Sequence, residues 1–193
     1  TTSGANDQGT ITSQNGKVIL NTNNINDLLN SNVTLPKQIT AKNLIANVTS
    51  DTKFSKSLNF NGSGIENFTL NTTKKIDVEN FITGSHLNLT LKGSNITVKE
   101  TGSEYGNIGG SNGLNNINLI TSNNSGVITL SNSIRASDSL SLIGNINITD
   151  KGDQDTITLI ADNNILLEDV HTVEEVLASS SDELITPLVG TNL

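Results

Sequence analysis

Short runs in which apolar and polar residues alternate recur along the chain and are separated by Asn, Ser and Gly. The clearest, Leu87-Asn88-Leu89-Thr90-Leu91, places Leu on one face and Asn or Thr on the other, as a half-buried strand requires. Runs of this length, about ten residues apart, are typical of short strands joined by tight turns. The pattern predicts an all-β chain with further strands at 33–35, 39–41, 44–48, 58–60, 68–70, 76–78, 96–98, 114–120, 127–130, 140–143, 146–148, 156–160 and 165–167.

Strands this short allow two architectures, a β-sandwich or a solenoid of stacked parallel strands. The solenoid is favoured because the strands are even and the expected inward positions are nearly all Ile, Leu or Val, which stack on their own kind. Asn is abundant at the turns, where stacked side-chain amides form ladders of hydrogen bonds. We predict a solenoid of short parallel strands with about 20–30 residues per coil and ~4.8 Å between layers, with a β-sandwich as the alternative.

Two local signals lie near the N-terminus. Gln14-Asn15-Gly16 separates two β-type runs, and Asn-Gly in this position predicts a hairpin or another tight turn, because both residues tolerate positive φ. The stretch 24–30 is compatible with one helical turn or with an extended excursion, and the sequence leaves both open.

The pattern changes near the C-terminus. Thr172-Val173-Glu174-Glu175 has the form of a capping box, and Val173, Val176 and Leu177 share one helical face. The sequence therefore predicts a solenoid over residues 1–170 and a short helical cap or exit segment over residues 171–193.

Composition narrows the character of the core. Aromatic residues are 3% of the chain, and Trp, Met and Cys are absent. The core must therefore consist of Ile, Leu and Val, which suits many similar layers better than one compact centre. The absence of Cys excludes a disulfide framework and is compatible with an exported bacterial surface protein.

The net charge of −8 and the pI near 4.6 exclude classes of partner that need a basic face, namely nucleic acid and an anionic membrane surface. The longest apolar run is only a few residues, so we expect no membrane insertion by this segment. The chain begins at Thr1 without Met and shows no signal peptide, so we expect a piece of a larger, processed protein.

The stretch 107–148 carries a recognisable order of residues: Ile-Gly, then Leu-x-x-Ile-Asn-Leu, then a Gly turn with Val-Ile-Thr-Leu, then Ile-x-Ala. It resembles a repeat of bacterial autotransporter passenger domains, and among these it is most similar to the rickettsial surface cell antigens. The Asn-rich remainder resembles in style the filamentous adhesins exported by two-partner secretion. The matching residues are Ile108, Gly109, Leu114, Ile117, Asn118, Leu119, Gly126, Val127, Thr129, Leu130, Ile134 and Ala136.

The resemblance implies a right-handed parallel β-helix displayed on the extracellular face of an outer membrane, or secreted, and often acting in virulence as an adhesin or invasin. The C-terminal β-barrel translocator usual in the family is absent from this sequence, which agrees with a fragment. No binding residues follow from the resemblance, because the matching motif is a structural repeat.

One acidic stretch is a candidate metal site. Asp150, Asp153 and Asp155 are spaced like part of a calcium loop, and oxygen-rich turns bind Ca²⁺. The Asp-x-Asp-x-Asp-Gly and Gly-Gly-x-Gly-x-Asp patterns are both missing, so a solvated acidic turn is the favoured interpretation. No cofactor is expected.

Enzymatic activity is not expected. A carbohydrate-cleaving site on a β-helix needs paired acids, usually with basic neighbours and aromatic sugar platforms, whereas this chain has one Arg, one Tyr and no Trp. His86 and His171 lie far apart in the sequence, and no Ser has the context of a nucleophile.

We therefore expect a segment of an adhesin or invasin that contacts a host-cell surface protein or glycan through its faces and loops. The alternative is a structural spacer or surface-layer segment with no binding of its own. Terminal coils of a solenoid have unpaired strand edges, which leaves self-association open.

Overall fold

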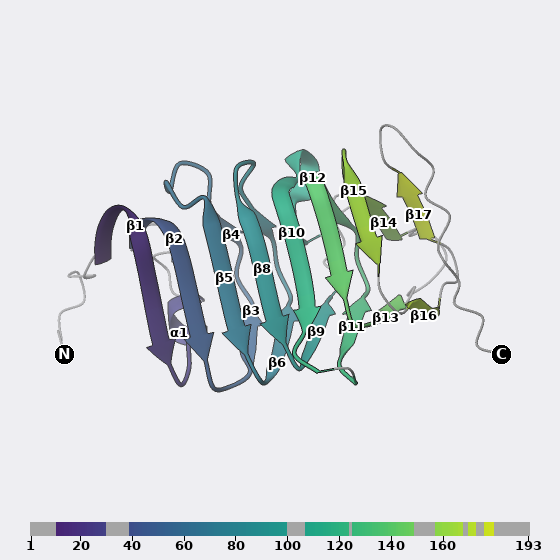
Figure 1. Cartoon of the computed structure of the whole chain (residues 1–193), viewed down its shortest axis with the longest axis horizontal. Coiled ribbons are helices and arrows are strands. Elements are labelled where there is room, and N and C mark those ends of the chain that lie inside the picture. The colour runs from purple at the N-terminus through teal and green to yellow at the C-terminus, as the bar shows by residue number, and fades with distance from the viewer. Residues whose placement is uncertain are drawn as a thin grey trace.

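A computed structural model describes residues 11–29, 39–99, 107–123, 125–148, 157–167, 170–172 and 176–179. In these ranges every pair of hydrogen-bonded strands is parallel. Figure 1 shows the strands side by side along the long axis, from β1 (Ile11–Thr22) at one end to β17 (Val176–Ser179) at the other. The fold is a parallel β-solenoid, as predicted, and the β-sandwich alternative is excluded because sandwich sheets are antiparallel.

The coils build three faces. The first face contains, in order, β1, β2 (Ile39–Val48), β5 (Asn67–Thr72), β8 (Asn88–Gly93), β10 (Leu114–Thr121), β12 (Ile134–Ile143) and β15 (Asn164–Leu167). The second face contains β3 (Thr52–Phe54), β6 (Lys75–Val78), β9 (Asn95–Val98), β11 (Val127–Leu130), β13 (Asn145–Ile148) and β16 (Val170–Thr172). The narrow third face contains β4 (Leu58–Asn59), β7 (Ile82–Thr83), the start of β12, β14 (Ile157–Ile160) and β17.

Ile108 joins the two ends of the third face. It forms parallel bridges to Ile82 of β7 and to Ile134 of β12, and Ile134 pairs in turn with Leu159 of β14. The first residues of β12 thus pair with β14, whereas its later residues pair with β15. Each coil therefore passes from the third face to the first and then to the second.

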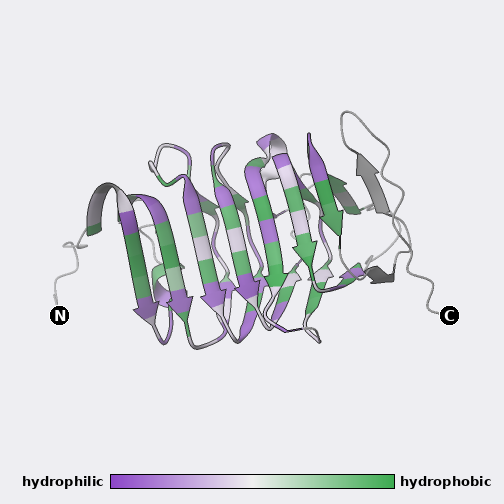
Figure 2. Ribbon diagram, in the orientation of Figure 1, coloured by the Kyte–Doolittle hydropathy of each residue, from purple (hydrophilic) through white to green (hydrophobic). Residues whose placement is uncertain are grey.

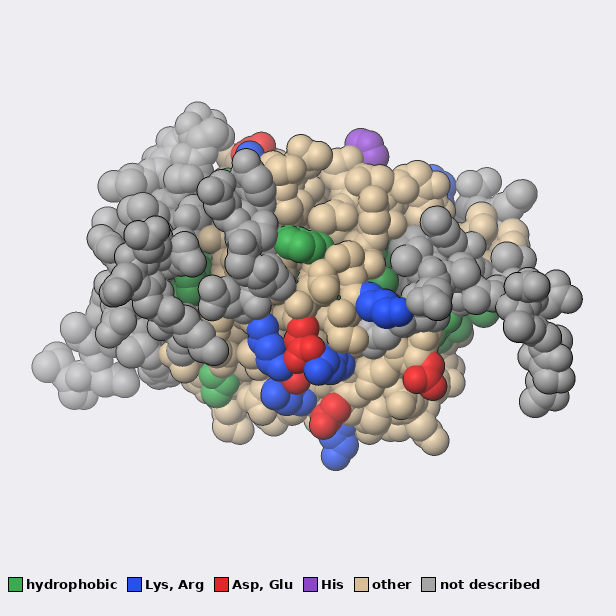
Figure 3. Space-filling model, turned by 180° about the vertical axis from the view of Figure 1, so that it is seen from behind, with side chains coloured by type: hydrophobic (Ala, Val, Ile, Leu, Met, Phe, Trp, Pro, Cys, Tyr) green, Lys and Arg blue, Asp and Glu red, His purple; other side chains and the backbone are tan. Residues whose placement is uncertain are grey.

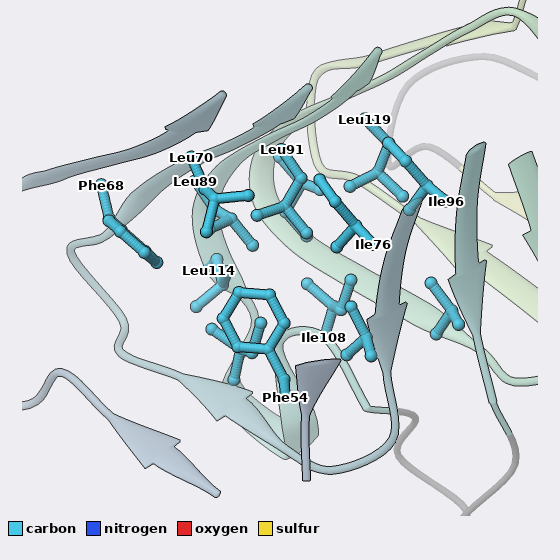
Figure 4. Close-up of a cluster of buried hydrophobic side chains, with 14 of the residues drawn as sticks. Phe54, Phe68, Leu70, Ile76, Leu89, Leu91, Ile96, Ile108, Leu114 and Leu119 are labelled. Atoms are coloured by element: carbon cyan, nitrogen blue, oxygen red, sulfur yellow. The ribbon is translucent and has the colours of Figure 1, made fainter. Parts of the chain in front are cut away.

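Inward-facing side chains of successive coils stack in columns. Phe68 lies in register between Leu44 of the preceding coil and Leu89 of the next, and Ile117 and Leu140 continue this column. All five side chains are buried, and Figure 4 shows side chains from several strands converging on one interior. Burying one such side chain contributes roughly 1.5–3 kcal/mol. The stacked aliphatic core predicted from composition is confirmed in large part, although Phe54, Phe60 and Phe68 are also buried in it.

The repeat length varies from coil to coil. Hydrogen-bonded Asn pairs on the first face are separated by 24 residues at Asn43 and Asn67, by 21 at Asn67 and Asn88, and by 28 at Asn88 and Asn116. These separations fall within the predicted length of a coil. They explain why similar runs recur in the sequence without a fixed period, because the connections between faces differ in length while the strands stay in register.

The stretch 24–30 contains one helical turn, α1 (Asn26–Leu29). The side-chain oxygen of Asn24 accepts a hydrogen bond from the backbone N–H of Asn26, and Leu29 is buried in the core. The Asn26 side chain also accepts a bond of 2.7 Å from the backbone N–H of Lys53 in β3. The helical turn thus gives the terminal strand of the second face a hydrogen-bond partner, and the choice left open by the sequence is settled.

The prediction of a hairpin at Gln14-Asn15-Gly16 is wrong. β1 runs through this point without reversing, and its pairing with β2 shifts between Ser13 and Lys17. The extra residues form an irregularity of the kind found at β-bulges. A reversal does not occur because β2 offers one continuous parallel partner on both sides of the Asn-Gly pair.

The short helix expected near Thr172 is also wrong in the part that the structure describes. β16 ends at Thr172 and pairs with β13, and Val176 and Leu177 belong to β17, which pairs with β14. The unpaired edges of β13 and β14 offer backbone partners, and this tertiary pairing outweighs the local capping signal. Residues 173–175 and 180–193 lie outside the described residues, so the boundary at 170/171 stays a prediction.

Candidate functional site

The described residues contain no candidate metal site. No group of three or more His, Cys, Asp or Glu side chains lies close enough there to hold a metal ion. Asp150, Asp153 and Asp155 lie outside the described residues, so the calcium hypothesis stays a prediction. His86 is exposed in the turn between β7 and β8, and the side chain of His171 is outside the described part. Over the same ranges, no helix has the length and apolar character needed to cross a bilayer.

Asn side chains stack along the outer surface of the first face in two columns. The first amide column consists of Asn43, Asn67, Asn88 and Asn116, with each Nδ2 donating to the Oδ1 of the preceding coil at 2.8–2.9 Å. The second amide column consists of Asn21, Asn47 and Asn71, with distances of 2.8 and 3.0 Å.

These ladders confirm the hydrogen-bonded Asn stacks expected from the sequence, although their location differs. Both amide columns lie on strands, whereas the expectation placed them in turns. One stacked pair does lie between strands, where buried Asn132 donates to Asn107 at 3.0 Å. An amide has two N–H groups and an oxygen with two lone pairs, so each strand Asn keeps bonding capacity toward solvent.

A groove of about 1050 Å³ runs along the corner where the first face ends and the chain turns toward the second. Figures 1 and 2 show this corner at the arrow tips of β1, β2, β5 and β8, where the ribbon is hydrophilic. We call it the corner groove. Its lining residues are Asn21, Thr22, Asn23, Asn47, Val48, Thr49, Asn71, Thr72, Thr73, Lys92 and Ser122.

The corner groove is held by its own hydrogen bonds as well as by the second amide column. The hydroxyl of Thr49 donates to Asn23 Oδ1 at 3.1 Å, and the hydroxyl of Thr72 donates to the carbonyl of Ser50 at 3.2 Å. Thr72 Oγ1 also accepts a bond of 3.0 Å from the backbone N–H of Lys74. These bonds link the turns that follow β1, β2 and β5 to one another.

The second face carries a cluster of five charged side chains, the ion-pair cluster. Lys53 Nζ lies 2.6 Å from Glu79 Oε2, Lys75 Nζ lies 3.0 Å from Asp77 Oδ1, and Lys99 pairs with both acids. Figure 3 shows this gathering of basic and acidic groups on the side opposite to the view of Figure 1. The charges largely compensate one another, so the cluster stabilises neighbouring coils and offers little net field to a partner.

We expect the stability of the protein to fall as the pH drops into the range where Glu79 is protonated. Hydrogen bonds from Lys53 and Lys99 hold the pKa of Glu79 below its ordinary value. The ionised Glu79 side chain therefore contributes to the free energy of unfolding at pH values above the ordinary Glu pKa of ~4.3. This contribution is lost as the pH falls through the lower pKa of the folded state. Glu79 also raises the pKa of Lys99. The charged Lys99 side chain therefore contributes to stability at pH values below the ordinary Lys pKa of ~10.4, and this contribution is lost as the pH rises through the raised pKa.

The measurement is urea unfolding of the wild type and Glu79→Gln between about pH 6 and about pH 3. The stability difference between the two proteins should shrink toward the acidic end. Glu66→Gln is the control, because Glu66 pairs with Lys42 at 3.0 Å where both side chains are about half exposed, and it should change little at either pH. A difference between wild type and Glu79→Gln that stays constant across this range would contradict the assignment.

The motif that carries the family resemblance has a structural role. Ile108 is buried and bridges two coils, and Leu114, Ile117 and Leu119 point into the core. Gly109 adopts φ +103, and a Cβ there would lie 2.0 Å from the carbonyl oxygen of Arg135. None of these side chains lines the corner groove.

Sequence reasoning missed both the corner groove and the ion-pair cluster. A signal for the groove was present, because Asn recurs four residues apart in successive strands, as Asn43 with Asn47 and Asn67 with Asn71. This spacing puts both residues of a strand on the same outer surface. Only the register of the coils shows that the second Asn of each pair lines a common groove.

Comparisons with known proteins found no relative of this chain. No family model matches the chain, and none of the curated proteins or solved structures matches it either.

Proposed function

We propose that this chain is a segment of a secreted outer-membrane autotransporter passenger that acts as an adhesin or invasin toward host cells. The observation that carries the proposal is the solenoid itself, whose first face presents two columns of Asn side chains on its outer surface. Such a surface suits extended, shallow contact with a cell-surface molecule.

The placement of the motif residues supports the same proposal. Ile108 and Gly109 occupy a tight corner between coils, and Leu114, Ile117 and Leu119 fill the core of the next strand. A repeat used in this way serves to stack coils, which is the role that the resemblance to passenger domains implies. Location on the bacterial cell surface, or secretion from it, belongs to this proposal.

A structural spacer is the second candidate. It is favoured by the regular succession of coils from β2 to β13, in which the strands of the first face stay in register with their neighbours except for single shifts. A spacer would hold an adhesive part of the parent protein away from the membrane, and its own surface would bind nothing.

Binding of the purified segment to cultured mammalian cells separates the two candidates. An adhesin segment should bind saturably when folded, and a heat-unfolded sample should not compete. Binding no greater than that of the unfolded sample would leave the spacer as the function of this segment.

A further inference from the structure

We propose that the corner groove binds a short oligosaccharide whose acidic sugar lies at the Lys92 end. The inference rests on the adhesive function proposed above and names the site and ligand class of that function. It starts from the lining, in which Asn, Thr and Ser side chains predominate, with Val48 as the single apolar residue and Lys92 as the single charged one.

The lining fits a hydroxyl-rich ligand better than a protein. Protein interfaces are enriched in aromatic side chains, and none lines the groove. Sugar hydroxyls both donate and accept hydrogen bonds, as do the amides and hydroxyls of the groove. The groove also has no aromatic platform, so we expect weak affinity that becomes useful through several copies on one surface.

The second amide column keeps free bonding groups at regular spacing. Asn21, Asn47, Asn71 and Lys92 are in register on four successive strands, about 4.8 Å apart. Each amide in the column uses one N–H or one lone pair for its neighbour and retains another. Asn71 Oδ1 accepts no hydrogen bond from the residues that the structure describes. A linear sugar chain laid along this column would meet one amide per layer.

Lys92 makes the two ends of the second amide column chemically different. Among the described residues it forms no ion pair, whereas Lys42, Lys53, Lys75 and Lys99 all do. The ammonium therefore has no carboxylate to compensate it, and it lies one layer beyond the last amide of the column. Lys92 is the single charged residue of the lining, so a ligand with one carboxylate at this end matches the groove.

The test is a titration of the ¹⁵N-labelled chain with 3′-sialyllactose, which carries one carboxylate, and with lactose, which carries none. Amide shifts should move at the C-terminal ends of β1, β2, β5 and β8, and 3′-sialyllactose should bind up to about fivefold more tightly than lactose. Lys92→Gln should erase that difference. Lys56→Gln, which changes the same charge on an exposed residue between β3 and β4, should preserve it.

Asn71→Ala should weaken binding of both sugars about fivefold, because one ligand hydrogen bond is lost. Asn67→Ala is the matched control, since Asn67 lies on the same strand and donates to the Asn 24 residues earlier, as Asn71 does, but belongs to the first amide column. Equal effects of the two variants, or shifts confined to other faces, would overturn the proposal. Saturable cell binding that is unaffected by Asn71→Ala and Lys92→Gln would overturn the proposal that the corner groove binds the ligand. The proposed adhesin function would remain supported.

Discussion

Phe68→Ala is expected to lower the free energy of unfolding by about 4 kcal/mol. Phe68 is fully buried in β5, in register between Leu44 and Leu89, and its ring stacks on Phe60 with centroids 5.5 Å apart. Truncation removes the ring and leaves a cavity between layers that are fixed by backbone ladders on both sides. Such a loss is a large share of the ~5–15 kcal/mol typical of a folded domain.

Urea unfolding followed by circular dichroism measures this loss. Phe68→Leu is the matched control, because Leu is the residue that the two neighbouring coils use at the same position of the column. It should cost about 1–2 kcal/mol, since most of the buried volume is kept. If Phe68→Ala and Phe68→Leu cost the same, the ring does not fill the interior as described.

Phe68→Ala is also expected to reduce the cooperativity of unfolding. A solenoid is stabilised by contacts between neighbouring coils, so a weak layer near the middle reduces the coupling between the coils on its two sides. β5 lies between β2 and β8 on the first face. We expect the unfolding transition of the variant to broaden or to split, which is visible as a lower slope against urea concentration.

The alternation of apolar and polar residues predicted the longer strands, and their evenness favoured the solenoid over a sandwich. The short strands β3 and β7 were not predicted, and the strand predicted at 33–35 lies outside the described residues. In β8, Leu89 and Leu91 are buried while Asn88 and Thr90 stay partly exposed, which is the two-residue period that a strand imposes. The aliphatic composition was sufficient to predict stacked columns, because similar side chains in register fill equivalent space in each layer.

The two local predictions that failed did so for the same physical reason. Asn15-Gly16 and the capping box at Thr172 are signals about the backbone of a few residues, and both were overridden by a parallel neighbour that offers a row of hydrogen-bond partners. Local propensity amounts to about 1 kcal/mol per residue or less, whereas pairing with an open strand edge engages several residues at once.

The corner groove was beyond prediction for a different reason. Its column joins Asn21, Asn47, Asn71 and Lys92, which are separated by unequal stretches of chain. Which Asn meets which depends on the length of every intervening turn, and a shift by one residue would turn the column to the other side of the sheet. The register is therefore a property of the folded stack that no single coil encodes.

Gly109→Ala is expected to destabilise the protein by about 3 kcal/mol. Gly109 has φ +103, a conformation that costs an L-residue energy by itself. In addition, a Cβ at this position would lie 2.0 Å from the carbonyl oxygen of Arg135 in the next coil. That contact can be relieved only by moving the two coils apart, which would break the bridge between Ile108 and Ile134 and lengthen the hydrogen bond of 3.0 Å from Arg135 N to Ile108 O.

Gly64→Ala separates the two parts of this cost. Gly64 has φ +75, but no atom lies within 4 Å of the position its Cβ would take, so only the backbone penalty of about 1 kcal/mol applies. Thermal and urea unfolding of both variants should therefore differ by about 2 kcal/mol, the part due to the close approach of coils. Equal losses of stability in the two variants would mean that the coils around Gly109 relax without cost. The close contact with Arg135 would then not restrict this position to Gly.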